Sequence, residues 1–318
     1  MAFTLATFNV KNLFDPAAGA AARERDLVTR KVEAIAETLR ACDADVVGLQ
    51  EVGSPRLLQA VLDLWPEGRY REPVLGTADA RGIRCALLSR LPVTDARVET
   101  AATLPFPVFQ LGDRAPFGDR IPLRRGVVRA RLASDQGPVH VLVVHFKSPL
   151  PVDLRGRDGA AIAPSTQHER AEGVLRSLVW RAAEALHART LVDALLASDP
   201  EASLAVVGDF NDGPASPVVR VLRGEAGGAP GDAGAAEPFD GALYDCAARV
   251  EAGRRFSAWH GGAPSQIDHV LATAGLYRRV AAARFLNESL RDHGAFDPSA
   301  DEAPTVDSDH AALVVRFE

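Results

Sequence analysis

Hydrophobic and polar positions along the chain follow two periods. Apolar residues recur at spacings of four, three and four, as in a helix that packs by one face, at Val28, Val32, Ile35 and Leu39 within residues 26–40 and again at Ala171, Leu175, Leu178 and Ala182. Short runs rich in Val and Leu, bounded by turn residues, predict strands at 45–50, 86–93, 126–132 and 139–146. The pattern therefore predicts strands that alternate with helices.

Two stretches interrupt this pattern. Residues 149–167 are rich in Pro and Gly, and residues 224–241 are rich in Gly and Ala and poor in bulky hydrophobic side chains. Both are predicted to be surface excursions. Because strand-like runs lie on both sides of each, neither stretch divides the chain into halves of different pattern. The sequence predicts a single domain over residues 1–318.

Polar side chains recur where the predicted strands end or begin. Six segments share this feature, namely "ATFNV" with Asn9, "VVGLQEV" with Glu51, "LVVHFKS" with His145, "VVGDFND" with Asp209 and Asn211, "QIDHVL" with Asp268, and "DSDHAALVV" with Asp309 and His310. Each residue has an ordinary structural explanation, such as a turn or a satisfied core histidine. Six coincidences together indicate one site that is assembled from several strand ends.

In this order, the segments resemble the motifs of the endonuclease/exonuclease/phosphatase superfamily. That group contains deoxyribonuclease I, exonuclease III, abasic-site endonucleases, inositol polyphosphate 5-phosphatases and neutral sphingomyelinases. The most specific signals are "GDFND" at 208–212 and "SDH" at 308–310, and the resemblance extends from residue 9 to residue 310. It implies an α+β fold, a four-layer α/β/β/α sandwich of two mainly antiparallel sheets packed face to face between flanking helices.

The resemblance also implies roles for the acidic and amide residues. Glu51 is similar to a direct metal ligand, and Asp309 to a further carboxylate of the metal site. Asp209 is similar to the carboxylate that orients the nucleophile, and Asn211 to the amide that holds this carboxylate or the phosphate. Asn9 is similar to a polar group of the active site beside Glu51.

The basic residues of the motifs are assigned in the same way. His145 is similar to a group that contacts the phosphate or donates a proton, and His310 to the histidine near the scissile phosphate. Asp268 is similar to the acid that orients this histidine. Arg125 stands where relatives place a phosphate-binding arginine, but the residues after it depart from their usual Glu-Pro.

The chemistry of a phosphate ester explains these residue types. Hydrolysis needs an in-line water, neutralisation of charge on the phosphoryl oxygens, and stabilisation of the leaving oxygen. Every candidate metal ligand is a hard oxygen donor, which favours Mg²⁺ or Mn²⁺, with Ca²⁺ as an alternative, and disfavours zinc. The sequence thus predicts a divalent cation as the cofactor.

Lysine is rare in this chain, which draws attention to its positions. Its only lysines are Lys11, Lys31 and Lys147, and Lys11 and Lys147 each follow a motif residue by two positions. Residues i and i+2 of an extended strand point to the same face, so both ammonium groups are candidate phosphate contacts. The alternative, that both are ordinary solvated side chains, remains open at this point.

Composition limits the remaining possibilities. Hydrophobic residues make up 47% and charged residues 25% of the chain, and no apolar run approaches the length of about 18 residues that a membrane helix requires. The net charge of −6 argues against sequence-blind wrapping of nucleic acid but allows a local basic patch. The arginine-rich residues 114–131 are equally compatible with a polyanion contact and with a solvated face.

Cysteine content and the N-terminus suggest where the protein works. The three cysteines Cys42, Cys85 and Cys246 are odd in number and form no C-x-x-C pair, so neither a disulfide framework nor a zinc cluster is indicated. Met1 leads directly into "AFTLATFNV" without a signal segment. We expect a cytoplasmic protein, or a secreted or periplasmic one if a signal peptide was removed.

These observations favour a metal-dependent phosphodiesterase, a nuclease with DNA as its substrate; no protein partner is inferred. The alternative is a phosphomonoesterase or phosphodiesterase acting on a small or lipid phosphate, of the inositol polyphosphate or sphingomyelin type. A phosphatase of that kind should carry dense basic residues after the catalytic segments, yet residues 211–223 contain only Arg220 and Arg223. A non-catalytic binding module is less favoured, because no motif residue is missing.

Overall fold

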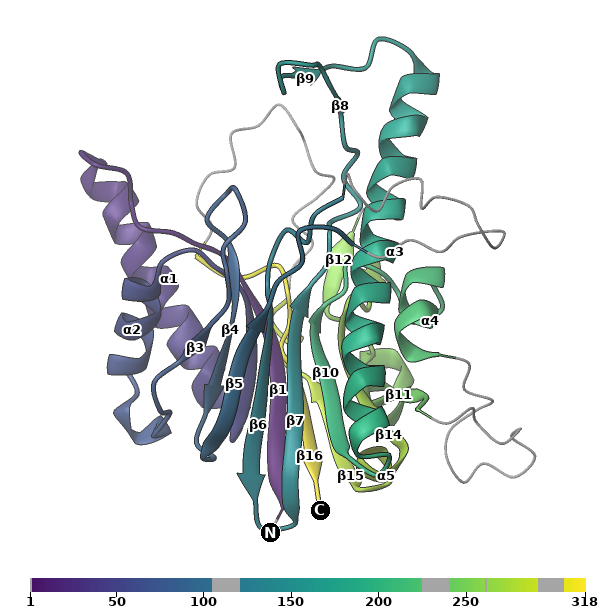
Figure 1. Cartoon of the computed structure of the whole chain (residues 1–318). Helices are drawn as coiled ribbons and strands as arrows, with labels where there is room; N and C mark the ends of the chain where they lie inside the picture. The colour runs from purple at the N-terminus through teal and green to yellow at the C-terminus, as the bar shows by residue number, and fades with distance from the viewer. Residues whose placement is uncertain (1, 105–120, 225–240, 261, 291–305) are drawn as a thin grey trace, which may run out of the picture.

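A computed structural model describes residues 2–104, 121–224, 241–260, 262–290 and 306–318. Two six-stranded sheets pack face to face (Figure 1). The first has the order β15 (Val280–Phe285), β16 (Leu313–Phe317), β1 (Phe3–Leu13), β2 (Val46–Val52), β4 (Arg84–Ser89), β3 (Val74–Leu75). The second has the order β11 (Leu243–Asp245), β14 (Asp268–Thr273), β10 (Ser203–Asp209), β7 (Gly137–His145), β6 (Val127–Ser134), β5 (Val93–Glu99).

Helices cover the outer face of each sheet. The helices α1 (Ala22–Cys42) and α2 (Pro55–Asp63) lie on the first sheet, and α3 (Gln167–Ser198) and α4 (Pro217–Arg223) lie on the second (Figure 1). Only β1–β2 and β7–β10 pair in parallel within these sheets, and the other neighbours are antiparallel. The predicted four-layer sandwich of two mainly antiparallel sheets is confirmed.

Alternation along the central strands builds three apolar cores. Successive side chains of a strand point to opposite faces. In β1, Leu5 therefore belongs to the core between the sheets, while Ala6 belongs to the core under α1 and α2. In β7, Val143 faces the first sheet and Leu142 faces α3. The sheets approach closely at Gly48, where a Cβ atom would lie 2.6 Å from Val207.

The remaining short elements complete the fold. The helix α5 (Ala274–Arg278) connects β14 to β15, and two small hairpins are formed by β8 (Leu154–Arg155) with β9 (Ala161–Ile162) and by β12 (Ala258–His260) with β13 (Ala263–Ser265). The hairpin β8–β9 is exposed and lies within the excursion predicted at 149–167. Of the other predicted excursion, residues 225–240 lie outside the described residues.

The helix predicted at 26–40 is confirmed as part of α1, where Val32, Ile35 and Leu39 are buried. The strand predicted at 86–93 is wrong at its end, because β4 stops at Ser89 and β5 begins at Val93. Pro92 lies in this break, and proline cannot donate a ladder hydrogen bond. The strands predicted at 45–50, 126–132 and 139–146 correspond to β2, β6 and β7 to within two residues at each end.

The buried face of α3 differs from the apolar stripe in the sequence. Leu175 and Leu178 are 58% and 39% exposed, whereas Ser177, Arg181 and Glu184 are buried. The prediction that the apolar stripe faces the core is therefore wrong for this half of the helix. The polar residues are buried because they bond to the loops that follow β7 and β10.

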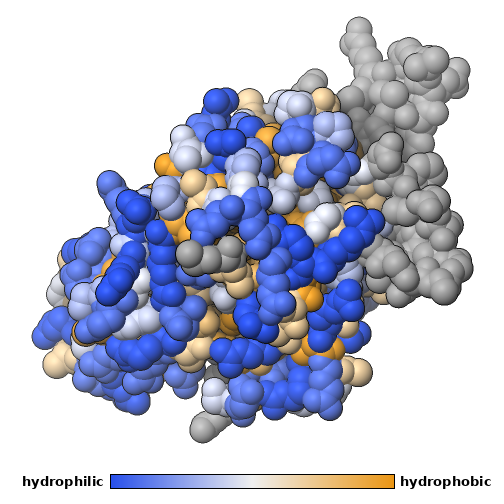
Figure 2. Space-filling model, turned by 90° about the horizontal axis from the view of Figure 1, so that it is seen from below, coloured by the Kyte–Doolittle hydropathy of each residue, from blue (hydrophilic) through white to orange (hydrophobic). Residues whose placement is uncertain are grey.

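The lower face of the molecule is mainly polar (Figure 2). Both chain ends lie at the lower end of the molecule (Figure 1), and the face seen from below is mainly hydrophilic, with hydrophobic residues in small groups (Figure 2). Cys42, Cys85 and Cys246 are buried and unpaired. None of the described helices has the length and apolar character needed to cross a membrane.

Candidate active site

Strand pairing brings the predicted residues to one end of the molecule. The parallel pair β1–β2 places Asn9 opposite Gln50, next to Glu51, and the parallel pair β7–β10 places His145 opposite Asp209. The antiparallel strand β14 places Asp268 on the other side of Asp209. Because parallel strands end at the same edge, polar groups from both sheets meet there.

Asp209 lies at the centre of this cluster. Its side chain is buried, and Oδ2 accepts a hydrogen bond of 2.9 Å from Asn9 Nδ2. Oδ1 accepts a hydrogen bond of 2.8 Å from the backbone N–H of Asn211. The Nε2 atoms of His145 and His310 lie 3.5 and 4.0 Å from Oδ2. The carboxylate is therefore held between two amide groups and two imidazoles.

The backbone around Asp209 is adapted to this position. At Gly208 a Cβ atom would lie 1.9 Å from the carbonyl oxygen of Val144, so only glycine allows β10 to end so close to β7. Glu51, Lys11 and Asn211 have φ angles of 63°, 47° and 53°. Left-handed backbone at residues other than glycine is uncommon and costs free energy, and it gathers at functional sites.

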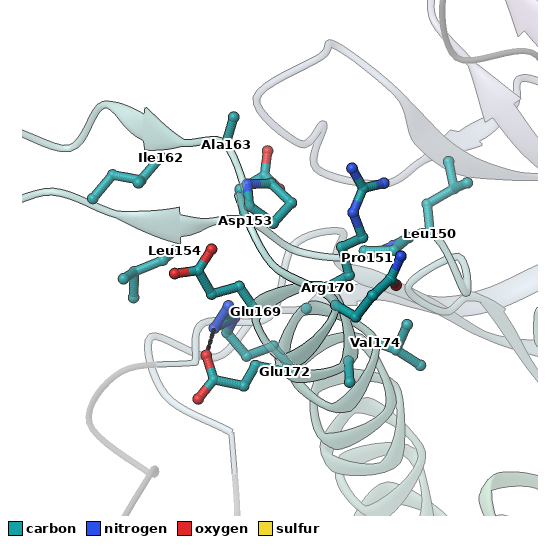
Figure 3. Close-up of a pocket in the computed structure, with 15 residues that line it drawn as sticks. Leu150, Pro151, Asp153, Leu154, Ile162, Ala163, Glu169, Arg170, Glu172 and Val174 are labelled. Carbon is teal, nitrogen blue, oxygen red and sulfur yellow. Dashed lines mark ion pairs between the residues drawn. The ribbon is translucent and has the colours of Figure 1, made fainter.

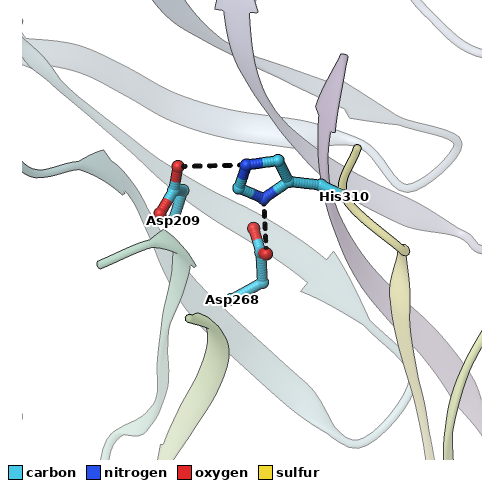
Figure 4. Close-up of side chains that lie close together, drawn as sticks. All are labelled: Asp209, Asp268 and His310. Atoms are coloured by element: carbon cyan, nitrogen blue, oxygen red, sulfur yellow. Dashed lines mark hydrogen bonds and ion pairs between the residues drawn. The ribbon is translucent and has the colours of Figure 1, made fainter. Parts of the chain in front are cut away.

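His310 is held by a carboxylate from the other sheet. Its Nδ1 lies 2.8 Å from Asp268 Oδ2, and this contact directs Nε2 toward Asp209 (Figure 4). Ser308, which precedes the histidine by two residues, donates a hydrogen bond from Oγ to the carbonyl of Asn9 and accepts one from the N–H of His310. Ser257 Oγ accepts hydrogen bonds from the backbone N–H groups of Ile267 and Asp268.

The two histidines are in different electrostatic surroundings. Burial lowers the pKa of His145 well below its usual value, and Arg125 lowers it further. Burial alone would also lower the pKa of His310, but the charges of Asp268 and Asp209 outweigh it and raise that pKa well above its usual value. Burial raises the pKa of Asp209 to about 7. A neutral imidazole and a charged one therefore flank a carboxylate whose pKa is raised toward neutral pH.

Glu51 and Asp309 are the candidate metal ligands. Glu51 Oε1 accepts from Asn9 Nδ2 at 3.2 Å, and Oε2 accepts from the N–H of Asn12 at 2.9 Å. Asp309 Oδ2 pairs with Lys11 Nζ at 2.8 Å. The side chains of Glu51 and Asp309 are 18% and 33% exposed, so their oxygens remain accessible. A donor set of accessible carboxylate oxygens beside an amide fits a hard divalent cation.

A second group with suitable distances is formed by Asp209, Asp268 and His310, whose ligand atoms lie within 4.8 Å of one another (Figure 4). In this group His310 Nδ1 is already bonded to Asp268. A charged imidazolium repels a cation and offers it no lone pair. This arrangement suits proton transfer and anion binding better than metal binding.

The three predicted phosphate contacts are placed differently. Lys11 reaches the cluster through Asp309. Arg125 is buried and donates from Nη1 to the carbonyl of His145 at 2.9 Å and from Nε to Asp79 at 3.1 Å. Lys147 Nζ donates to the carbonyls of Ser148 and Leu150 at 2.7 and 2.9 Å. Because β7 ends at His145, strand alternation does not extend to Lys147.

Sequence reasoning missed the polar residues of α3 that support the site. Arg181 donates from Nε to Asp212 Oδ2 at 2.9 Å and from Nη1 to the carbonyl of Lys147 at 3.2 Å. Glu184 Oε2 accepts from the N–H of Lys147 at 2.6 Å. These bonds join the loops after β7 and β10. The only signal available in the sequence was that Ser177, Arg181 and Glu184 recur at helical spacing in a helix otherwise predicted to pack by an apolar face.

A buried histidine beneath the Asp209 loop was also missed. His269 Nε2 lies 2.9 Å from the carbonyl of Asp212, and Nδ1 lies 3.1 Å from Asp245 Oδ2. Its ring stacks on Phe210, with centroids 4.7 Å apart. Burial lowers the pKa of His269, but its bond to Asp245 outweighs this effect and raises it overall. Through the bond to the carbonyl of Asp212, the pair of His269 and Asp245 stabilises the backbone of the "GDFND" segment.

A hollow of about 850 Å³ lies between the hairpin β8–β9 and the start of α3 (Figure 3). Apolar side chains such as Leu154, Ile162 and Val174 line it together with the ion pair of Arg176 and Glu172. Among the described residues, its lining contains none of the predicted site residues. The cluster around Asp209 is therefore separate from this hollow.

Comparisons with known proteins concern the family and the fold. A model of the endonuclease/exonuclease/phosphatase family matches residues 6–310. No curated protein sequence matches the chain. Solved structures with a similar fold include an AP endonuclease from Archaeoglobus fulgidus (15% identity, TM-score 0.56, covering 99% of both chains) and a 3'-5' exonuclease from Neisseria meningitidis (16% identity, TM-score 0.57, 99% of both chains). D. rerio TDP2 complexed with a single-strand DNA product is also similar (13% identity, TM-score 0.53, 100% of this chain and 99% of that chain).

Proposed function

The chain belongs to the endonuclease/exonuclease/phosphatase family, and from this premise we propose that it is a divalent-metal-dependent phosphodiesterase that hydrolyses DNA. The observation that carries the proposal is the buried carboxylate of Asp209, which faces His145 and His310 and is held by Asn9. A carboxylate with a pKa of about 7 is suited to take a proton from water at neutral pH.

In the proposed reaction, Asp209 orients a water molecule for in-line attack on phosphorus and accepts its proton. Asn9 and the N–H of Asn211 keep the carboxylate in place. His310, kept charged by Asp268, contacts the phosphoryl oxygens on which negative charge accumulates. The bond from phosphorus to the leaving ester oxygen then breaks, that oxygen takes up a proton from solvent, and Asp209 releases the proton that it accepted to solvent.

Glu51 and Asp309 would hold the divalent cation in this proposal. The cation, when bound, supplies neutralisation of the phosphoryl charge and stabilisation of the leaving oxygen. Lys11 pairs with Asp309, so it would keep that carboxylate in place or contact the phosphate directly. Carboxylate oxygens favour Mg²⁺ or Mn²⁺ for this position.

Two arguments support DNA as the substrate class. Similar folds are found in proteins named AP endonuclease and 3'-5' exonuclease, and in one complexed with a single-strand DNA product. An internal phosphodiester carries one negative charge, whereas a terminal monoester carries nearly two and needs more cations. Among the described residues, His310 is the one charged cationic group within 4.0 Å of the Asp209 carboxylate, which suits a diester.

The proposal is tested by following hydrolysis of plasmid DNA, linear DNA, bis(p-nitrophenyl) phosphate and p-nitrophenyl phosphate. We expect chelator-treated protein to be inactive, Mg²⁺ or Mn²⁺ to restore activity, and the diester to be cleaved faster than the monoester. The variant Asp209→Asn serves as the control for contaminating nuclease. Full activity after metal removal would overturn the mechanism. A preference for the monoester without DNA cleavage would instead favour a phosphatase.

A further inference from the structure

A cluster of cationic side chains lies beside the site, between α3 and the loops that follow β7 and β10. It contains Arg124, Arg125, Lys147 and Arg181. The carboxylates that lie against these residues are Asp79, Asp212 and Glu184. Four cations thus face three carboxylates. Glu184 is buried, and burial raises the pKa of its carboxyl group.

The positive charge that has no carboxylate of its own lies on Arg124 and Lys147. Arg124 and Arg125 share one carboxylate oxygen, Asp79 Oδ2, at 3.5 and 3.1 Å. Lys147 Nζ bonds only to neutral oxygens, namely two carbonyls and the hydroxyl of Ser148, and no carboxylate of the described residues lies within 4.0 Å of it. Burial and the nearby charges of Arg124 and Arg181 lower the pKa of Lys147 to about 8. An anion bound beside Arg124 would reduce the electrostatic repulsion among the cationic side chains of this cluster.

Arg124 is the member of the cluster that a ligand can reach. Its side chain is 24% exposed, whereas that of Arg125 is 5% exposed. The guanidinium lies 5.7 Å from the ring centroid of Trp180, a contact that fixes its position. The indole Nε1 of Trp180 is buried without an acceptor among the described residues. The cluster thus holds more donors than acceptors.

Backbone contacts place this cluster next to the catalytic residues. Arg125 bonds to the carbonyl of His145, and Arg181 bonds to Asp212, the neighbour of Asn211. The cluster therefore lies on the His145 and Asn211 side of Asp209. Lys11 and Asp309 form a separate pair at the metal-binding carboxylates. A polynucleotide whose scissile phosphate lies at Asp209 would place a neighbouring phosphate either near this cluster or near Lys11 and Asp309.

We propose that Arg124 binds a phosphate adjacent to the scissile one in a polynucleotide substrate. The inference rests on the proposed phosphodiesterase function and extends it to substrate choice. A small diester such as bis(p-nitrophenyl) phosphate has no second phosphate for this subsite. The subsite would therefore favour polynucleotides over single-phosphate esters.

The binding test uses a fluorescently labelled oligonucleotide, chelator in the buffer and Asp209→Asn as the common background. Adding Arg124→Gln should weaken binding several-fold and reduce the slope of log Kd against log salt by about 0.7–0.9, the contribution of one phosphate contact. Arg124→Lys retains the charge and should keep most of the salt dependence. Arg97→Gln is the matched control, because Arg97 is a 63% exposed arginine on β5. Equal affinities for Arg124→Gln and Arg97→Gln would overturn the proposal.

The kinetic test compares kcat/KM for the oligonucleotide with kcat/KM for bis(p-nitrophenyl) phosphate in the presence of Mg²⁺. In Arg124→Gln we expect the ratio to fall at least about five-fold, the loss of one charged contact to the substrate. Equal losses on both substrates would assign Arg124 to the scissile phosphate or to folding, and would overturn the proposal. If the parent protein binds the oligonucleotide through Arg124 but hydrolyses neither substrate, the proposed function fails while the subsite stands.

Discussion

His310 Nδ1 lies 2.8 Å from Asp268 Oδ2, and this bond joins the two sheets at the candidate active site. Asp268 begins β14 in the second sheet, and His310 precedes β16 in the first. A carboxylate that accepts from Nδ1 fixes the orientation of the imidazole and leaves Nε2 toward Asp209. The relative position of the two sheets therefore determines where this histidine can act.

Replacing Asp268 by Asn should remove this control. Asn carries no negative charge, so the pKa of His310 should fall and the imidazole should lose the charge that the proposed reaction uses at the phosphoryl oxygens. We expect kcat to fall by roughly 10²–10⁴, with a smaller change in KM. Steady-state kinetics on bis(p-nitrophenyl) phosphate measure this effect. The exposed Asp95→Asn on β5 is the matched control, and wild-type turnover in Asp268→Asn would contradict the orienting role.

Asp209→Asn and His310→Ala should each reduce catalysis without changing the fold. Loss of the proton-accepting carboxylate or of the charged imidazole should lower kcat by roughly 10²–10⁴. Circular dichroism should show an unchanged fold, since the core clusters do not contain these residues. If both variants kept near-normal turnover, the motifs "GDFND" and "SDH" would have only structural roles.

Arg181→Met tests the support that α3 gives to the site. The substitution leaves Asp212 and the carbonyl of Lys147 without a donor from Arg181, in a partly buried region. We expect the free energy of unfolding to decrease by about 1–3 kcal/mol. Arg170→Met, on the exposed start of the same helix, should change it by less than about 0.5 kcal/mol. Equal unfolding midpoints in urea for the two variants would show that the bonds of Arg181 contribute nothing measurable.

The pair of His269 and Asp245 should make stability depend on pH. The pKa of His269 is raised above 6.5, so its contribution is complete below pH 6.5 and is lost as pH rises through the folded pKa. Burial would raise the pKa of Asp245, but its bonds, first that to His269, lower it below 3.8. That contribution is complete above pH 3.8 and is lost as pH falls through the lowered pKa. The pair therefore stabilises most between about pH 4 and 6.5.

His269→Gln isolates this contribution from other titrating groups. We expect the difference in unfolding free energy between the parent protein and the variant to be larger at pH 5.5 than at pH 9. Urea denaturation at both pH values measures it. A difference that does not change with pH would mean that His269 is neutral throughout and acts only through its neutral hydrogen bonds and its stacking on Phe210.

From the sequence by itself the strands β2, β6 and β7 and part of α1 could be predicted, together with the residues that the structure brings together around Asp209. Strand and helix periods are local, because they depend on which side chains point to the same face within a few residues. The segments around Asp209 and His310 could be found for the same reason, since a short apolar strand followed by polar groups is visible in the sequence. The family resemblance then implied how the layers are stacked.

Only the tertiary structure decided where the charged groups around this centre point. Arg125 turns inward to the carbonyl of His145, and Lys147 turns to the carbonyls of its own loop, although both follow motif patterns. Arg181 and Glu184 interrupt an apolar helix because loops from two strands need their hydrogen bonds. Long polar side chains can satisfy their charge in several directions, and the choice depends on partners far away in the chain. No local pattern can encode that choice, because the partners are brought together only when the two sheets and α3 have packed.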